Sequence, residues 1–514
     1  MKIGGDSGTG DLSVPGLYPV TVRSSIDPTK FAVTNLAVQP NYSISSLTTV
    51  ASALQVGISP SDVAINPATG IAVVANTGSD NVSLIDLTAP SPTVVATICT
   101  GAVGAVAPCP VAGPTSVSVD YVRNIAVVAN TAAKTIAVVD LGTRSVTYVS
   151  PALLDSPGAV GINPVTGRAL VAMQTRNYGI VMDLTQTPPV FVWPVSISTG
   201  NKTRVAVEPN LNWAVATPGG VGSLGIVDLN RQNQNTITGL SRTTNVVTVT
   251  VQASTTQSPQ PPLTVQLNDV VEIQGAIING AADPSFDGFW TVSGLGPGVS
   301  QFTFTQVNGT LPDVAPAAGN ATGAVSYSQP VATAALTPSI QGIAINPETE
   351  QAVLVDPTTS GVVTFFSLIN QSTHTLGLKT NNSFETGTIA AAYNPLTNLV
   401  VAVNSFTNTL SLIDPSTPVR LNDGNLYQTR PGPVAVAIDP GTNLAVIANQ
   451  GDNSVTILSL GAIQPFDITE TSPKTFVANS TLTSAAAPSA LTMTVLGKGF
   501  TTNSVVRLNG AGVS

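Results

Sequence analysis

The stretch "VAINPATGIAVVANTGSDNVSLIDL", residues 63–87, decides the fold because its pattern recurs seven times along the chain. In each copy an apolar strand ends at Asn, Asp or Glu before a turn. A second strand then ends near Ala-Asn, and a third ends near Asp. We call the residue that closes the first strand of a copy its anchor. The seven anchors are Asn66, Asp120, Asn163, Glu208, Asn346, Asn394 and Asp439.

The spacing of the anchors predicts the architecture. Successive anchors lie 54, 43, 45, 138, 48 and 45 residues apart. A unit of about 45 residues is the length of a four-stranded propeller blade, and the copies lack the 3.6-residue apolar period of helical repeats. The sequence therefore predicts an all-β protein with a seven-bladed β-propeller formed by residues 43–242 and 336–465.

The longest interval predicts an inserted small β-domain, a barrel or sandwich, over residues 243–335. Segments such as "VTVTVQA" from Val247 and "QFTFTQV" from Gln301 alternate apolar and polar residues between turn signals. At the start of the propeller, residues 43–57 read as an outer strand without a blade. We expect this strand to complete the last blade and to cover its edge.

The repeats resemble a known family. The run "AVVANTGSDNVSLIDL" (72–87), echoed by "AVVANTAAKTIAVVDL" (126–141) and "AVIANQGDNSVTILSL" (445–460), is similar to the YVTN family of seven-bladed β-propellers. The resemblance implies a bacterial surface-layer or secreted propeller and no particular activity.

The two ends of the chain carry a second resemblance. "VPGLYPVTVRSS" (14–25) resembles the closing strand of an immunoglobulin-like IPT/TIG domain, and "LTMTVLGKGFTTNSVVRLN" (491–509) resembles its opening strands. Such a domain needs about 80–100 residues. We therefore expect partial Ig-like β-sandwich segments at 1–30 and 466–514, and we expect Ig-like modules to continue beyond both ends.

The composition and the cysteines limit the classes of partner that the protein could bind and indicate its cellular compartment. The formal net charge is −9 without a basic run, which disfavours nucleic acid. Apolar residues are spread over short strands, so no membrane insertion is expected in this segment. Cys99 and Cys109, the two cysteines of the chain, are predicted to form a disulfide. A disulfide favours an oxidising compartment, and we expect an extracellular or cell-surface protein.

Few residues suggest catalysis, cofactor binding or metal binding. The one histidine, His374, cannot build a multi-histidine metal site, and neither a Gly-x-Ser-x-Gly elbow nor a phosphate-binding glycine loop is present. We therefore predict no catalytic, cofactor or metal residues. The turns at Thr77 and Gln450 lack the acidic oxygens of a calcium loop. The Asp that ends the third strand in most copies is expected to accept hydrogen bonds from the following turn.

A binding site, if present, is expected at the mouth of the central channel, where loops converge over the propeller axis. Four positions before the anchors, only Asp62 and Arg204 are charged. Together with Arg430, just before the seventh inner strand, they are candidates to line one mouth. The alternative is that they are solvated charges at loop ends.

The leading hypothesis is a non-enzymatic extracellular or cell-surface scaffold for adhesion, protein binding or envelope structure, with a protein or a surface glycan as partner. Two alternatives remain. One is a lactonase-like propeller hydrolase. The other is a polysaccharide-binding module, for which the chain offers Trp193, Trp213 and Trp290, the first two in or near blade strands.

Overall fold

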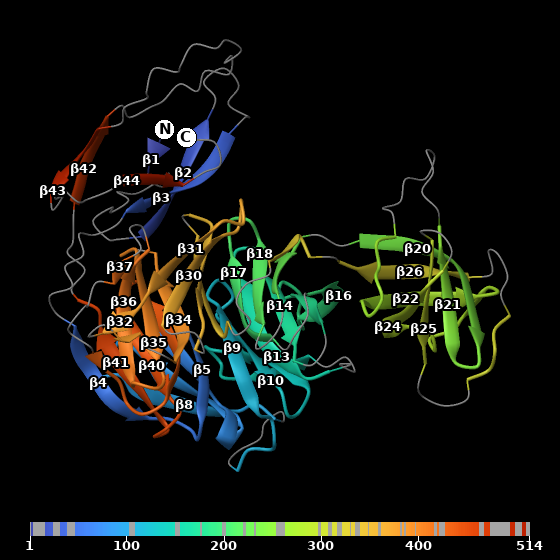
Figure 1. Ribbon diagram of the computed structural model, residues 1–514, viewed down its shortest axis with the longest axis horizontal. Coiled ribbons are helices and arrows are strands. Elements are labelled where there is room, and N and C mark those ends of the chain that lie inside the picture. Colours follow the sequence, from blue (N-terminus) through green and yellow to red (C-terminus); the bar gives the residue numbers. More distant parts are fainter. Residues whose placement is uncertain are drawn as a thin grey trace, which may run out of the picture.

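The computed structural model describes residues 47–461 apart from short segments, together with six strands near the ends of the chain (Figure 1). The segments not described within that range are 102–107, 150–154, 175–176, 198–201, 219–222, 231–232, 253–262, 297–299, 307–310, 316–320, 329, 335–339, 348, 358–360, 381–382, 385–386, 396, 416–418 and 421–426.

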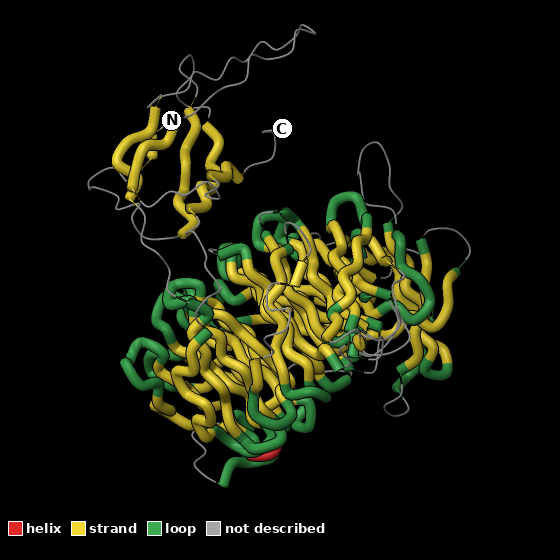
Figure 2. Tube along the Cα trace, turned by 60° about the vertical axis from the view of Figure 1, so that its left-hand side comes forward, coloured by secondary structure: helices red, strands yellow, loops and turns green. Residues whose placement is uncertain are grey.

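The regular secondary structure of the described residues is almost entirely β-strand, as predicted (Figure 2). Seven antiparallel sheets form the blades of a propeller. The 3₁₀ turn η1 (Thr77–Ser79) is the one helical element among the described residues. No helix within this part of the chain has the length and apolar character needed to cross a membrane.

The strands of blades 1 to 4 follow, from the inner to the outer. They are β5 (Pro60–Asn66), β6 (Ile71–Asn76), β7 (Asn81–Asp86) and β8 (Thr93–Cys99); β9 (Pro114–Asp120), β10 (Ile125–Asn130), β11 (Thr135–Asp140) and β12 (Val146–Val149); β13 (Pro157–Asn163), β14 (Arg168–Met173), β15 (Tyr178–Asp183) and β16 (Val190–Ser196); and β17 (Lys202–Glu208), β18 (Trp213–Pro218), β19 (Leu224–Asp228) and β27 (Ala332–Ala334).

Blades 5 to 7 follow the same order. Their strands are β28 (Gly342–Asn346), β29 (Gln351–Val355), β30 (Val362–Ser367) and β31 (Thr373–Gly377); β34 (Thr388–Asn394), β35 (Leu399–Asn404), β36 (Thr409–Asp414) and β37 (Val419–Arg420), with β38 (Tyr427–Gln428) also on β36; and β39 (Pro433–Asp439), β40 (Leu444–Asn449), β41 (Ser454–Ser459) and β4 (Thr48–Gln55). A short hairpin, β32 (Lys379–Thr380) with β33 (Ser383–Phe384), lies between blades 5 and 6 in the sequence.

The last blade is completed by the beginning of the propeller sequence. Strand β4 pairs antiparallel with β41, with Thr48 opposite Ser459 and Gln55 opposite Ser454. Ala51 and Leu54 of β4 pack against the buried cluster shared by blades 1 and 7. The predicted closing strand is therefore confirmed, and it covers what would be the free edge of β41.

Apolar side chains fill the spaces between blades. Val73 and Leu84 of blade 1 pack with Val117 and Val128 of blade 2 in one buried cluster. On the other face of β6, the strand of Val73, Val74 packs against blade 7. The second strands have apolar side chains on both faces because each blade is covered on both sides.

Three of the anchors bond to the next blade on the face where the inner strands end, which we call the anchor face. All seven anchor side chains are buried. Asn66 shows the pattern: its Oδ1 accepts from the Ala68 amide at 2.9 Å, and its Nδ2 donates to Asn124 Oδ1 of blade 2 at 2.7 Å. The same amide-to-amide bond joins Asn163 to Asn212 and Asn394 to Asn443.

The receiving asparagines stand four residues after an anchor, in a turn that requires left-handed backbone. The φ angles at this position lie between 45° and 69° in all seven blades. Glycine and asparagine tolerate this conformation best. The position is occupied by Gly70, Asn124, Gly167, Asn212, Glu350, Asn398 and Asn443.

A second set of bonds joins blades on the opposite face, where the inner strands begin, which we call the mouth face. Asp80 Oδ1 accepts from the amides of Ala112 and Gly113 in the loop that leads into blade 2, each at 2.8 Å. Asn453 Oδ1 accepts from the Ser59 amide, which ties blade 7 to blade 1. The turns "TGSDN" and "QGDNS" thus provide links between blades.

The insertion forms a closed barrel of six strands between the third and fourth strands of blade 4. Its strands are β20 (Asn233–Thr243), β21 (Val246–Val251), β22 (Val270–Ile278), β24 (Gly288–Leu295), β25 (Gln301–Thr305) and β26 (Ala321–Tyr327), with the short β23 (Ala281–Ala282) paired to β22. Pairing of β22 with β26 closes the sheet on itself. The predicted inserted β-domain is therefore present as a barrel.

The barrel rests on blade 3, although it is inserted in blade 4 (Figure 1). The Ser196 amide at the end of β16 donates to Ser328 O at 3.0 Å, and Ser196 Oγ donates to Asp269 Oδ1 of the barrel. Val270 lies in the same buried cluster as Tyr178 and Met182 of blade 3. The barrel therefore covers part of the outer strand of blade 3.

Strands from the two ends of the chain meet in one sheet. Its order is β1 (Lys2–Ile3), β2 (Gly16–Arg23), β3 (Phe31–Val38) and β44 (Val506–Asn509), with Asn35 opposite Asn509. A second, two-stranded sheet pairs β42 (Asp467–Ser472) with β43 (Thr494–Lys498). Figure 1 shows these strands together, outside the ring.

Deletion of residues 48–55 tests the ring closure. The deletion removes β4 and exposes the edge of β41, so we expect the melting temperature to fall by roughly 10 °C or more. Differential scanning calorimetry measures it. As a control, Val50→Thr changes a partly exposed side chain of the same strand and should leave the melting temperature nearly unchanged. An unaltered melting temperature in the deletion variant would show that β4 does not hold the ring.

Glu208 makes the anchor of blade 4 sensitive to pH. Burial raises the pKa of its carboxyl, and Glu350, at the receiving position of blade 5, adds a like charge, while backbone hydrogen bonds from Leu211 and Asn210 offset part of the shift. A raised folded-state pKa means that ionisation destabilises the fold as the pH rises above the unfolded-state pKa. We expect Glu208→Gln to raise the melting temperature at about pH 7.5, and we expect the gain to shrink towards about pH 4.

Asp86→Asn is a control for which we expect the opposite change in melting temperature. Hydrogen bonds from the hydroxyl and the amide of Thr88 lower the pKa of Asp86. This carboxylate therefore stabilises the fold at neutral pH, and its contribution is lost as the pH falls through the folded-state pKa. Asp86→Asn should lower the melting temperature at neutral pH only. A gain for Glu208→Gln that did not change with pH would contradict the assignment.

Candidate functional site

The inner strands bring the seven residues that stand four positions before the anchors to the central channel. These ring positions are Asp62, Ser116, Ala159, Arg204, Gly342, Ala390 and Ala435, and all of them except Ala159 line one cavity of about 140 Å³ on the propeller axis. In six blades the pairing of the first two strands shifts register at the residue just before the ring position. Such bulges redirect the neighbouring backbone and side chains.

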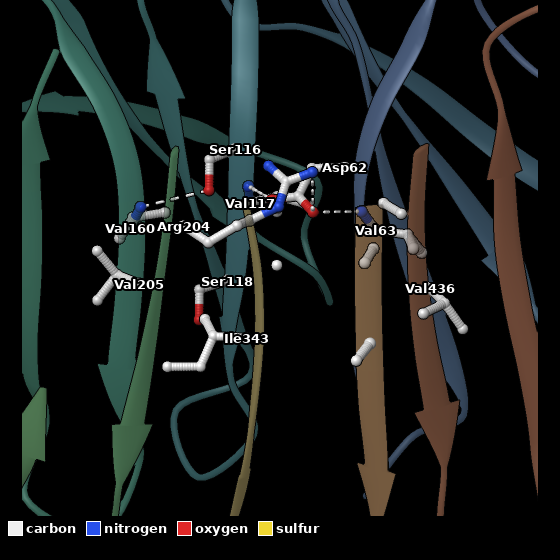
Figure 3. A pocket seen from close by; sticks show the side chains of 14 residues that line it. Asp62, Val63, Ser116, Val117, Ser118, Val160, Arg204, Val205, Ile343 and Val436 are labelled. Carbon is white, nitrogen blue, oxygen red and sulfur yellow. Dashed lines mark hydrogen bonds and ion pairs between the residues drawn. The ribbon is translucent and has the colours of Figure 1, made fainter. Parts of the chain in front are cut away.

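Arg204 reaches from blade 4 across the channel to blades 1 and 7. Its Nη2 donates to the main-chain oxygens of Ser61 at 3.2 Å and Val434 at 3.4 Å. Both acceptors are bulge residues. The Arg204 Nη2 also lies 3.9 Å from Asp62 Oδ1, an ion pair that is longer than a hydrogen bond. Figure 3 shows the Arg204 and Asp62 side chains meeting at the level of Ser116.

Backbone amides hold the Asp62 carboxylate. Its Oδ1 accepts from the Val63 amide at 3.1 Å, and its Oδ2 accepts from the Val117 amide of blade 2 at 3.0 Å. Ser116 makes the equivalent contact between blades 2 and 3: its Oγ accepts from the Val160 amide at 3.3 Å. These side chains therefore join successive blades as well as lining the channel.

A second cavity, of about 220 Å³, lies on the mouth side of Arg204. We call it the mouth. Arg204 lines both cavities, so it lies where the mouth and the channel meet. The mouth is otherwise lined by Thr115, Gly158, Gln174, Gln341, Ile389 and Val434. Among the described residues of this lining, Arg204 is therefore the charged one.

The structure brings Asp62 and Arg204 together, but it does not add Arg430 to them. Arg430 Nε donates to Asp452 Oδ2 at 2.6 Å on the mouth face of blade 7, and the Arg430 side chain is half-exposed. Arg430 lines neither the channel cavity nor the mouth. Arg430 lies in the loop before the inner strand β39, so it is not among the ring positions.

Sequence reasoning missed the polar residues of the mouth. Thr115 and Gln341 stand five positions before their anchors, one residue before the ring positions. A comparison of the residues at this position in the seven copies would have identified them. Gln174 directly follows the second strand of blade 3, at a place where four other blades have Asn. Pairing of β13 with β14 brings it to the start of the inner strand, where its amide donates to Ser156 O.

Cys99 and Cys109 form the predicted disulfide, with Cα atoms 5.2 Å apart. The bond ties the end of β8 to the loop before blade 2. Asn81 Nδ2 also lies 4.0 Å from Cys109 Sγ. The disulfide therefore holds a loop on the mouth face of blades 1 and 2.

Other residues considered for chemistry have structural surroundings. His374 lies exposed on the outer strand β31, 6.4 Å from the Phe365 ring. The third-strand aspartates accept from the following turn, as predicted: Asp140 Oδ1, for example, accepts from the Gly142 and Thr143 amides. Within the described ranges, no group of three or more His, Cys, Asp or Glu residues could hold a metal ion.

The three tryptophans pack within the protein. Trp193 is 4% exposed on β16, beneath the Arg168 guanidinium. Trp213 packs against the buried cluster of blades 4 and 5. Trp290 stacks on Phe304 of the barrel with ring centroids 4.6 Å apart. All three side chains therefore contribute to packing.

Comparisons with known proteins give no family for this chain. No protein-family model matches the sequence, and no curated protein matches it. Among solved structures, the chain is similar to hydrazine synthase of Kuenenia stuttgartiensis, with 13% identity and a TM-score of 0.44 over 82% of this chain and 100% of that chain. A likeness this weak carries no argument about function.

Replacement of Arg204 tests whether it braces the ring. Arg204→Gln removes the contacts to Ser61, Val434 and Asp62 and leaves the largely buried Asp62 carboxylate without its cation. We expect the free energy of unfolding to fall by about 2 kcal/mol at neutral pH, measured by urea denaturation. The isosteric Asp62→Asn variant keeps both carbonyl contacts of Arg204 and should cost less. A stability equal to the wild type in Arg204→Gln would contradict a bracing role.

Proposed function

We propose that this protein is a non-enzymatic extracellular or cell-surface scaffold that serves adhesion, protein binding or envelope structure. One observation carries the proposal: a closed ring carries a β-barrel on one of its outer strands and continues into further β-strands. The barrel contacts the outer strand of blade 3, and the strands from the chain ends are connected to blade 7. A ring whose blades are joined by side-chain bonds on both faces is a stiff platform between modules.

The extracellular part of the proposal is supported by the disulfide between Cys99 and Cys109. Disulfides persist mainly in oxidising compartments. The sequence resemblances supply the finer assignment, which is a bacterial YVTN-type propeller flanked by IPT/TIG-like modules. The division of the chain at residues 30, 43, 243, 336 and 466 stays a prediction.

Binding accounts for the channel mouth better than hydrolysis does. Asp62 accepts two backbone amides, and Arg204 donates to two backbone carbonyls. Both groups are therefore held in fixed positions by the ring itself. Fixed charges that line a small cavity suit the recognition of a ligand group.

A binding assay on the full chain tests this function. Purified protein is incubated with isolated bacterial cell envelopes, and the bound fraction is measured after sedimentation. The same preparation is incubated with a panel of lactones and aryl esters. We expect saturable binding and no turnover above buffer. Turnover that disappears in Asp62→Asn would instead establish the lactonase-like alternative, and absence of envelope binding would contradict the adhesion hypothesis.

A further inference from the structure

We propose that Glu272 makes the docking of the barrel on blade 3 sensitive to pH: ionisation of its carboxyl group loosens the contact, and protonation restores it. This inference goes beyond the proposed scaffold function and does not depend on it. It follows from the face of β22 on which Glu272 lies, from the cover that blade 3 gives to this face, and from the surroundings of the carboxyl group.

Glu272 lies on the outer face of the barrel. Successive side chains of a strand point to opposite faces. Val271 and Ile273 belong to the apolar core inside the barrel, so Val270 and Glu272 point outward. These two outward side chains are nonetheless buried, at 2% and 9% exposure, whereas Gln274 further along the strand is exposed. Another part of the molecule therefore covers this end of β22.

Blade 3 provides the cover. Strands β22 and β26 of the barrel lie beside β16, the outer strand of blade 3 (Figure 1). Val270 belongs to a buried cluster with Met182 of blade 3, and Phe289 of β24 packs against this cluster. In the barrel sheet, Glu272 stands between Phe289 on one side and Ser326, which is 2% exposed, on the other. Glu272 therefore belongs to the docked face of the barrel.

The surroundings of the carboxyl group disfavour its charge. Among the described residues, none donates a hydrogen bond to the buried Glu272 Oε2. Burial raises the pKa of Glu272, and a side-chain hydrogen bond with Gln274 offsets only part of this shift. An ionised carboxylate in such a place costs free energy that the neutral carboxylic acid does not.

The other titratable groups at this interface belong to the barrel and to blade 3. In the described structure they are Asp269, Asp287 and Tyr327 of the barrel, and Arg168, Tyr178 and Asp183 of blade 3. Arg168 Nη1 lies 3.4 Å from Asp183 Oδ2, and Asp269 accepts from Ser196 Oγ. β16 itself has no titratable side chain. Arg176 and Lys202, whose side chains the structure does not describe, are common to the wild type and to the variants compared below.

Docking is expected to weaken as the pH rises. The carboxyl pKa of Glu272 is higher in the docked state than in a released state, in which water surrounds the group. The contribution of the neutral acid to docking is therefore complete below the released-state pKa and is lost as the pH rises through the docked-state pKa. Release would also uncover Val270 and Phe289, an apolar surface of the barrel.

Hydrogen–deuterium exchange of the full chain between about pH 5 and pH 8 tests the inference. The reporter is the Ser196 amide, which donates to Ser328 O across the interface at 3.0 Å. Its protection factor, corrected for the intrinsic exchange rate at each pH, measures docking. We expect protection in the wild type to fall by up to about tenfold for each pH unit above the docked-state pKa, and we expect Glu272→Gln to keep it constant. Constant protection in the wild type, or an equal fall in Glu272→Gln, would overturn the inference.

Two further variants separate release of the barrel from other effects. Phe289→Ala removes apolar surface from the docked face and should lower Ser196 protection by a similar factor at every pH. Asp313→Asn neutralises an exposed barrel carboxylate that accepts from the Thr244 amide, and it should leave the pH profile unchanged. Unchanged protection in Phe289→Ala would contradict docking through this face. A pH-dependent loss of protection that is as large in β5 as in β16 would show that the ring opens, and it too would overturn the inference.

Discussion

Closure of the ring by β4 is the constraint on which the rest of the structure depends. Each blade is covered on both faces by its neighbours, so a circle without a partner for the last blade would leave buried surface exposed. The chain meets this need by pairing its first propeller strand with β41 of blade 7. The apolar cluster that includes Ala51 and Leu54 then spans blades 1 and 7. The inner strands can surround one axis only because the ring is complete.

Polar bonds then fix how each blade meets the next. Three anchor asparagines, Asn66, Asn163 and Asn394, reach into the following blade on one face, and the turn residues Asp80, Asn408 and Asn453 do so on the other. Buried amides such as those of the anchors are costly unless paired, so their bonds specify the relative positions of the blades. The junction between blades 4 and 5 departs from this pattern, because the carboxylates of Glu208 and Glu350 stand where these three junctions pair two amides.

Arg204 connects this framework with the candidate site. It belongs to blade 4, the blade whose outer strand β27 has three residues and follows the inserted barrel. Its guanidinium is bound by blades 1 and 7, the pair joined by the closing strand. The same contacts that brace the ring also hold a cation in the mouth.

The sequence by itself determined the repeat, the seven blades, the closing strand, the presence of an inserted β-domain and the disulfide, because each leaves a local pattern of apolar period, turn residues or cysteines. It also identified Asp62 and Arg204 as the charged ring positions. Only the tertiary structure decided that Arg204 crosses the channel, that Gln174 and Gln341 share its mouth while Arg430 pairs with Asp452, and that the barrel rests on blade 3. These contacts join residues far apart in the chain, and their geometry follows from the curvature of the ring, which no local pattern records.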